Sequence, residues 1–126
     1  MSNTESLKNP ILLVAFEGWN DAGNAASMAL DHLIDVWNAN LHSDLDPENY
    51  YDFQVNRPYI TTLESGERFV EWPSTSIHIA RDLKGNHDVV LIRGTEPNMR
   101  WRSFAEEILK LAEEFRVSKI IAIGAL

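Results

Sequence analysis

The sequence predicts an α/β protein built on a mainly parallel sheet with an antiparallel extension, and three observations carry this prediction. Apolar runs of strand length recur at residues 11–16, 89–92 and 119–123, and the first is typical of a strand covered on both faces. The first two lead through polar turns into helical patterns, which is the repeat of a parallel sheet. Between them, parts of the segment 51–81 alternate apolar and polar side chains with the period of half-buried strands.

The amino-terminal third of the chain predicts one strand and one helix. Residues 1–9 are polar and are followed by Pro10, so we expect a flexible tail before the strand at 11–16. Residues 40–49 are acidic and rich in turn formers, which predicts a surface loop. The helix between them covers about residues 24–38, and its apolar stripe consists of Ala26, Leu30, Leu33, Ile34 and Trp37.

The middle of the chain predicts strands rather than another helix. Residues 51–55 alternate as a half-buried strand does, and a proline then stops the pattern. Residues 59–63 and 68–72 flank a turn that contains Gly66, which is the pattern of a hairpin. Alternation returns at residues 76–81, so this block reads as the antiparallel or mixed extension of the sheet.

The last third of the chain returns to the strand and helix repeat. It predicts a buried strand at 89–92, an amphipathic helix over about 101–115 and a third strand at 119–123. Residues 103–106 match a capping box, although a helix start nearer Asn98 also fits the pattern.

We expect residues 1–126 to form a single α/β domain, since no linker, internal repeat or low-complexity segment divides them. The third strand ends at the edge where the other two carry their loops, and the chain stops directly afterwards on Ala125 and Leu126. We therefore expect a chain that is incomplete at its carboxyl terminus.

Composition limits the class of protein. With 44% hydrophobic and 24% charged residues, the chain has the balance of a soluble globular domain. No apolar run approaches the roughly 20 residues that cross a bilayer, and no signal peptide opens the chain. Because there is no cysteine, a disulfide framework and a thiolate metal site are excluded, and we predict a cytoplasmic protein.

The net charge of −8 lies entirely in one half of the chain. Residues 1–56 hold nine carboxylates and one lysine, whereas residues 57–126 hold ten acids and ten bases. Such a surface repels nucleic-acid phosphates and anionic lipids, so we predict neither nucleic-acid nor membrane binding. The acidity can serve solubility, or it can form a face for a basic partner.

Candidate site residues follow the first two strands. Open parallel sheets bind ligands beyond the carboxyl ends of their strands, and Glu17, Asp21, Glu96 and Asn98 are predicted to lie there. Their side chains could share acid and base roles or hold a hard cation such as Mg²⁺. Alternatively, Asp21 and Asn24 cap a helix while Glu96 pairs with Arg93 or Arg100.

Other residues near the two loops widen the choice of ligands. Arg93 suits phosphate or carboxylate recognition, but the first loop matches neither a dinucleotide fingerprint nor a phosphate-binding loop. Trp19 and Trp101 could stack on a flat ligand, anchor a protein partner or pack in the core. The histidines lack the spacing of zinc ligands, and no serine stands where a nucleophile would need to be. We therefore assign no catalytic residue, metal or cofactor.

The two loops, EGWNDAGNAAS at residues 17–27 and RGTEPNMRWRSF at 93–104, resemble the signatures of the proteasome assembly chaperone 2 family, in particular its actinobacterial members. The segments at 62–81 and 119–126 add to this resemblance, which spans residues 11–126. The positions that match the family pattern are Gly18, Trp19, Asp21, Gly23, Arg93, Gly94, Glu96, Pro97 and Trp101.

The resemblance implies a three-layer α/β/α fold related to the nucleoside phosphorylase-like architecture and a tendency to form homo-oligomers. Family members in eukaryotes and archaea bind proteasome α-subunits and help ring assembly, so it also implies a protein partner of that kind.

Two hypotheses follow. In the first, the chain is a non-catalytic, protein-binding module of assembly-chaperone type. In the second, it binds or converts a small, nucleoside-like ligand at the carboxyl edge of the sheet, where Glu17, Asp21, Glu96 and Asn98 supply polar groups. Fold analogy alone does not decide between them, because function depends on the site.

Overall fold

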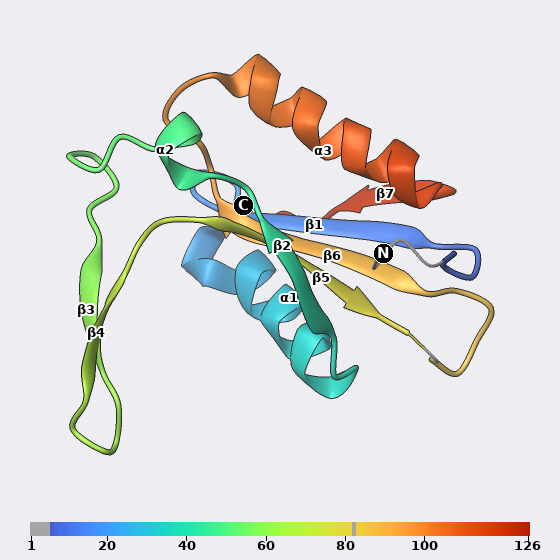
Figure 1. The fold of residues 1–126 in the computed structure, drawn as a ribbon, viewed down its shortest axis with the longest axis horizontal. Coiled ribbons are helices and arrows are strands. Elements are labelled where there is room, and N and C mark those ends of the chain that lie inside the picture. Colours follow the sequence, from blue (N-terminus) through green and yellow to red (C-terminus); the bar gives the residue numbers. More distant parts are fainter. Residues whose placement is uncertain (1–5, 82) are drawn as a thin grey trace.

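The computed structural model describes residues 6–81 and 83–126, which form a five-stranded sheet, a separate two-stranded hairpin and flanking helices (Figure 1). The main sheet has the order β2-β5-β6-β1-β7, and its strands are β1 (Ile11–Glu17), β2 (Asn40–Asp44), β5 (Thr75–Ala80), β6 (Val89–Thr95) and β7 (Lys119–Ala122). The other elements are η1 (Ala22–Asn24), α1 (Ala25–Val36), α2 (Pro47–Tyr50), β3 (Tyr59–Thr62), β4 (Arg68–Glu71) and α3 (Trp101–Phe115).

The sheet has a parallel core and an antiparallel extension, as the sequence predicts. Strand β1 lies between β6 and β7 and runs parallel to both. Strands β5 and β2 continue the sheet beyond β6 in antiparallel pairing. The predicted α/β class is therefore confirmed.

Helices cover the two faces of this sheet, with α3 on one side and α1 on the other (Figure 1). Successive residues of a strand point to opposite faces. Accordingly, Leu12 and Val14 of β1 join the cluster that contains Phe104 of α3, while Ala15 joins the cluster that contains Leu30 of α1. Burying a large aliphatic side chain such as Leu30 contributes about 1.5–3 kcal/mol, so both helices are held mainly by these contacts.

Strand β6 is longer than the apolar run 89–92 predicts. It continues to Thr95, and Arg93 and Gly94 therefore lie in the strand rather than in a loop. The reason is that β6 has partners on both sides, with Gly94 opposite Phe16 of β1 and opposite Thr75 of β5. Backbone pairing carries the strand beyond the point where apolar side chains end.

The prediction of a surface loop at residues 40–49 is wrong. Strand β2 pairs there with β5, Asn40 opposite Ile79 and Asp44 opposite Ser76, and the short helix α2 follows. An edge strand whose side chains are largely in water needs no apolar alternation, which is why the sequence pattern does not reveal it. The Asp46 carboxylate caps α2 by accepting a hydrogen bond from the Glu48 N–H at 3.1 Å.

The prediction of a strand at residues 51–55 is also wrong. The backbone turns there, and Asp52 stabilises the turn. Its carbonyl oxygen accepts hydrogen bonds from the N–H groups of Val55 and Asn56 at 3.0 and 2.8 Å. Its carboxylate accepts a third from the Gln54 N–H at 2.9 Å. Aspartate commonly bonds to its own following backbone in this way, and the turn that results replaces sheet pairing.

The capping box predicted at residues 103–106 does not form. Helix α3 begins at Trp101, so Ser103 already lies inside it. The residue before the helix is Arg100, which has a positive φ of 55° and makes no side-chain cap. Its carbonyl accepts the first helical hydrogen bond from Phe104 N–H at 2.9 Å, so the start nearer Asn98 is the better description.

The hairpin predicted around Gly66 is confirmed. Strands β3 and β4 pair antiparallel with Tyr59 opposite Glu71, and Gly66 supplies the positive φ of 90° in the turn. The hairpin stands away from the main sheet and pairs with none of its strands (Figure 1). Its large apolar side chains are 42% to 66% exposed, namely Tyr59, Ile60, Phe69, Val70 and the adjoining Trp72.

The amino terminus is described from residue 6 onward, so residues 1–5 of the predicted tail lie outside the described residues. Lys8 and Asp88 are linked near this end. The Lys8 N–H donates to the Asp88 carboxylate at 2.7 Å, and the Asp88 N–H donates to the Lys8 carbonyl at 2.8 Å.

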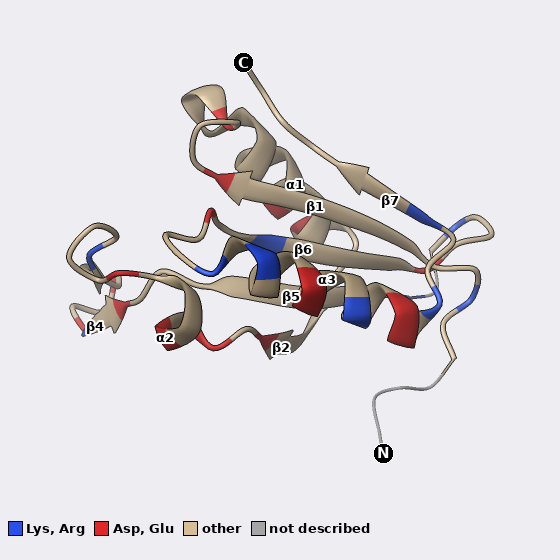
Figure 2. Ribbon diagram, turned by 90° about the horizontal axis from the view of Figure 1, so that it is seen from above, with Lys and Arg blue, Asp and Glu red and all other residues tan. Residues whose placement is uncertain are grey.

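Figure 2 shows acidic positions at the ends of β1 and β2 and in α2, and a mixture of acidic and basic positions along α3. This distribution matches the unequal charge of the two halves of the sequence. Among the residues that the structure describes, every helix is too short or too polar to cross a lipid bilayer.

Candidate functional site

The two candidate loops lie side by side, because the strands that precede them are neighbours. Glu17 at the end of β1 is in register with Thr95 at the end of β6. The Glu96 N–H donates to the Glu17 carbonyl at 2.9 Å, which holds the two loop starts together. The predicted adjacency of the two strands is confirmed, but the candidate side chains apart from Asn98 separate into three groups.

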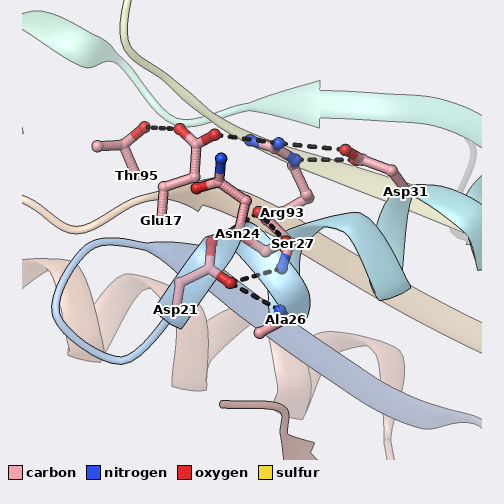
Figure 3. Close-up of polar contacts among 8 residues, drawn as sticks. All are labelled: Glu17, Asp21, Asn24, Ala26, Ser27, Asp31, Arg93 and Thr95. Carbon is pink, nitrogen blue, oxygen red and sulfur yellow. Dashed lines mark hydrogen bonds and ion pairs between the residues drawn. The ribbon is translucent and has the colours of Figure 1, made fainter. Parts of the chain in front are cut away.

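The first group is a chain of ion pairs around Arg93 (Figure 3). The Arg93 guanidinium binds Asp31 of α1 through Nε and Nη2 at 2.8 and 3.1 Å, and Nη2 also reaches Glu17 at 3.3 Å. Thr95 Oγ1 donates to the other oxygen of Glu17 at 3.3 Å. Burial would lower the pKa of Arg93, but the hydrogen bonds and charges of Asp31 and Glu17 raise it above its usual value.

This arrangement corrects one sequence-based alternative. Both ion pairs within the described residues are made by Arg93, with Glu17 and with Asp31. The alternative pairing of Glu96 with Arg93 or Arg100 is therefore wrong. Asp31 follows ten residues after Asp21 on the polar side of a helix, where no sequence pattern distinguishes it from an ordinary solvated residue.

The second group is the helix cap made by Asp21, which is only 5% exposed. Its Oδ1 accepts hydrogen bonds from the N–H groups of Ala26 and Ser27 at 2.7 and 3.1 Å, and its Oδ2 accepts one from Ser27 Oγ at 2.6 Å (Figure 3). These bonds satisfy N–H groups that the first turn of α1 would otherwise leave unpaired. The capping role proposed as an alternative for Asp21 is confirmed.

Asn24 does not share this capping role. It has a positive φ of 60°, and its side chain makes no cap hydrogen bond to α1. Gly23 precedes it with a φ of 61° inside η1, so two successive residues take the left-handed conformation and turn the chain into the helix.

The third group surrounds Glu96, on the α3 side of the sheet. A Cβ atom at Gly18 would meet the Glu96 side chain, which would have to shift, and the positive φ of 150° favours glycine at this position. Glu96 also borders a groove of about 320 Å³ with Trp101 and Phe104 of α3, and the groove is lined mainly by apolar atoms. Trp19 lies in the same turn as Gly18 and is 96% exposed, so the alternative of core packing is wrong for it.

Asn98 and Gly94 hold the scaffold together. The Asn98 side-chain oxygen accepts hydrogen bonds from Asp52 N–H at 2.8 Å and from the Asn56 side chain at 2.9 Å, which fastens the 52–56 turn. A Cβ atom at Gly94 would overlap Thr75 on the adjacent strand. The absence of a side chain at Gly94 therefore permits the close approach of β5 and β6.

A cavity of about 590 Å³ opens at the carboxyl edge of the sheet, between the first group and the base of the hairpin. Its wall includes the carboxylates of Glu17, Asp31 and Glu71, the guanidinium groups of Arg57 and Arg93, and Trp72. Within the described residues, no group of three or more histidine or acidic side chains has an arrangement that could hold a metal ion. The polar cavity and the apolar groove beside Trp101 are distinct, so the predicted site residues do not share one pocket.

Comparison with known proteins identifies the family. The sequence profile of the PAC2 family matches residues 15–126. The chain belongs to the PAC2 family. This confirms the resemblance seen in the loops at residues 17–27 and 93–104.

Solved structures agree with this assignment to the PAC2 family. A PAC2 family protein from Streptomyces avermitilis is 47% identical with a TM-score of 0.85, and the match covers 93% of this chain and 50% of that protein. A proteasome-assembly chaperone homologue from Mycobacterium tuberculosis is 44% identical with a TM-score of 0.83, covering 92% and 49% respectively. A protein of unknown function from Corynebacterium glutamicum is 28% identical with a TM-score of 0.77, covering 97% and 44%.

The chain thus spans about half the length of the solved relatives that it matches. The expected likeness to actinobacterial members is confirmed, since these relatives come from Streptomyces and Mycobacterium. No curated protein matches the chain.

Sequence analysis missed three residues that shape this PAC2 site. Tyr51 is buried, and its hydroxyl group lies 2.6 Å from both Thr75 Oγ1 and the Thr95 carbonyl oxygen. Asp31 and Glu71 bring carboxylates to the cavity from α1 and β4. Tyr51 and Glu71 come from segments far from the two loops in sequence, and Asp31 lies on the exposed side of the helix that follows the first loop, so only the folded chain reveals their roles.

Proposed function

We propose that this PAC2 chain is a non-catalytic, protein-binding module of the assembly-chaperone type. The observation that carries the proposal is the projecting β3–β4 hairpin with its exposed large apolar side chains. Keeping such side chains in water is unfavourable, and exposed apolar patches typically mark protein–protein interaction sites. An isolated two-stranded hairpin is also marginally stable in water, so contact with a partner would stabilise it.

Two further findings support the proposal. One is the 44% identity to a proteasome-assembly chaperone homologue, which makes proteasome α-subunits the first partner to test. The other is the use of the strand-end residues within the fold, since Asp21 caps α1 and Glu17 pairs with Arg93. Homo-oligomer formation, a cytoplasmic location and a single domain over residues 1–126 stay predictions within this proposal.

The test is affinity capture with quantification of proteasome α-subunits from a lysate of the source organism. An unrelated acidic protein serves as the control bait, because a chain with net charge −8 also collects basic proteins non-specifically. Enrichment of α-subunits well above the control would support the proposal. Equal recovery on both baits would contradict it.

The polar cavity of about 590 Å³ favours a second candidate function, the binding of a small, nucleoside-like ligand. Glu17 and Asp31 would supply the polar contacts, whereas Glu96 lies outside this cavity and is not part of the test. Thermal-shift measurements with adenosine and guanosine test this candidate. Stabilisation that is lost in a Glu17→Gln, Asp31→Asn variant would favour it, and the absence of any shift would count against it.

A further inference from the structure

The cavity at the sheet edge differs from an ordinary surface hollow because several separate elements build it. The ends of β1 and β6 contribute Glu17 and Arg93, helix α1 contributes Asp31, and the base of the hairpin contributes Tyr59 and Glu71. Tyr59 and Glu71 are cross-strand partners, so both project from the same face of the hairpin into the cavity wall. The cavity is therefore continuous with the exposed hairpin.

The charged groups of the cavity wall differ in whether they form ion pairs. Arg93 is bound to both Asp31 and Glu17, so these three groups largely neutralise one another. Glu71, by contrast, has no cation within ion-pair distance in the described part of the chain. Its neighbour is Tyr59, whose pKa is raised chiefly by hydrogen bonding to the Glu71 carboxylate. Arg57, the other guanidinium group of the wall, likewise has no carboxylate within ion-pair distance in the described residues, and the wall as a whole carries three carboxylates and two guanidinium groups.

Beside the Glu71 carboxylate lies an aromatic surface. Trp72 follows Glu71 directly, lines the cavity and is 53% exposed. The ring of Trp72 is held by an edge contact with Phe53 at a centroid distance of 5.0 Å. A cation over a tryptophan face gains cation–π attraction, and the aliphatic part of an arginine or lysine side chain packs well on such a ring.

We propose that this cavity binds an arginine or lysine side chain that a basic partner protein presents on an extended segment. Glu71 would pair with the cationic group, and Trp72 and Tyr59 would cover its aliphatic stem. The proposal rests on the protein-binding function proposed above and names the chemistry of its partner. A second copy of this chain suits the site less well, because two chains of net charge −8 repel each other.

Nuclear magnetic resonance titration of the chain with the blocked peptide acetyl-Val-Arg-Val-amide tests the proposal. The comparators are acetyl-Val-Glu-Val-amide and adenosine. We expect saturable shifts at the Glu71 amide and the Trp72 indole with the arginine peptide only. Glu71→Gln should raise the Kd about fivefold, as expected for the loss of one partly exposed charge pair.

Glu64→Gln is the matched control, because it removes the same charge from the turn of the same hairpin outside the cavity. It should leave the Kd unchanged. Equal weakening by both variants, equal or tighter binding of the glutamate peptide, or binding of adenosine alone at the cavity would overturn the proposal.

Failure of the cavity site can be distinguished from failure of the protein-binding function proposed above. Capture of α-subunits that is unaffected by Glu71→Gln, together with no peptide binding, would leave that function standing and remove the cavity from it. Peptide binding at the cavity without capture of α-subunits would keep the cavity site and refute the proteasome partner.

Discussion

Side chains at the carboxyl edge of the main sheet and side chains on the β3–β4 hairpin lie in opposite environments. At the sheet edge, buried polar groups find partners inside the protein, and Asp21 alone accepts three hydrogen bonds. On the hairpin, large apolar side chains such as Ile60 and Val70 remain in water. We infer that the edge is scaffold and the hairpin is binding surface, so substitutions at the edge should cost stability and substitutions on the hairpin should not.

The largest effect is expected at Gly94. A methyl group there would meet buried Thr75 of β5, including its backbone Cα, which cannot move aside as a flexible side chain would. Overpacking of this kind costs about 3 kcal/mol, so Gly94→Ala should lower the free energy of unfolding by about that amount. Urea denaturation monitored by circular dichroism measures it.

Gly23→Ala is the control for Gly94→Ala. Position 23 has open space around it but a φ of 61°, so alanine there should cost only about 1–2 kcal/mol through backbone conformation. If Gly94→Ala were no worse than Gly23→Ala, the close approach of β5 and β6 would not be a constraint.

The next largest effect is expected for Asp21→Ala. It removes the acceptor of the Ala26 and Ser27 N–H groups and of Ser27 Oγ, all at the buried start of α1. Loss of such a cap typically costs about 1–2 kcal/mol, and the same denaturation measurement applies. Asp35→Ala changes an exposed residue of the same helix and should stay within about 0.5 kcal/mol of the wild type. Similar losses in both variants would contradict the capping role.

Lowering the pH should also weaken the Asp21 cap, and the loss in free energy of unfolding should be smaller than that caused by Asp21→Ala. Burial alone would raise the pKa of Asp21, but hydrogen bonds from Ser27 and Ala26 bring it below the usual 3.8. A carboxyl group whose pKa is lower in the folded state stabilises the protein fully above its unfolded pKa and loses this contribution as the pH falls through its folded pKa.

Below about pH 4, the free energy of unfolding of the wild type should therefore fall more steeply than that of Asp21→Asn, which cannot titrate at this position. Parallel acid-limb slopes in the two proteins would show that the cap does not depend on the charge of Asp21.

Sequence reasoning recovered the elements that hydrophobic burial specifies. The strand at 11–16 and the helix at 101–115 have strong apolar patterns, and both are present within a residue or two of their predicted bounds. It failed where backbone hydrogen bonds decide the structure. Strand β2 has polar, exposed side chains, and the turn at Asp52 interrupts an alternation that reads as a strand.

The candidate site shows the same division. The strand register that aligns Glu17 with Thr95 follows from adjacent apolar strands, and the predicted adjacency is confirmed. The partners Asp31 and Glu71 lie 14 and 54 residues after Glu17, on a helix and on a hairpin whose placement no local pattern specifies. Which polar residue caps a helix and which one lines a cavity depends on such long-range packing.

The smallest effect on stability is expected on the hairpin, where Ile60 and Val70 face each other across β3 and β4. Threonine retains the β-branched shape that suits a strand, and both side chains are more than half exposed. Ile60→Thr with Val70→Thr should therefore change the free energy of unfolding by no more than about 0.5 kcal/mol. Ile77→Ala, at a fully buried position of β5, should cost about 3 kcal/mol in the same assay.

The informative readout for the hairpin variant is binding. If the exposed pair contributes apolar contact area to a partner, the double variant should lose capture of that partner while its unfolding curve stays superimposable on that of the wild type. A large loss of stability would instead mean that the pair is already packed within this chain, and the contrast between scaffold edge and binding hairpin would fail.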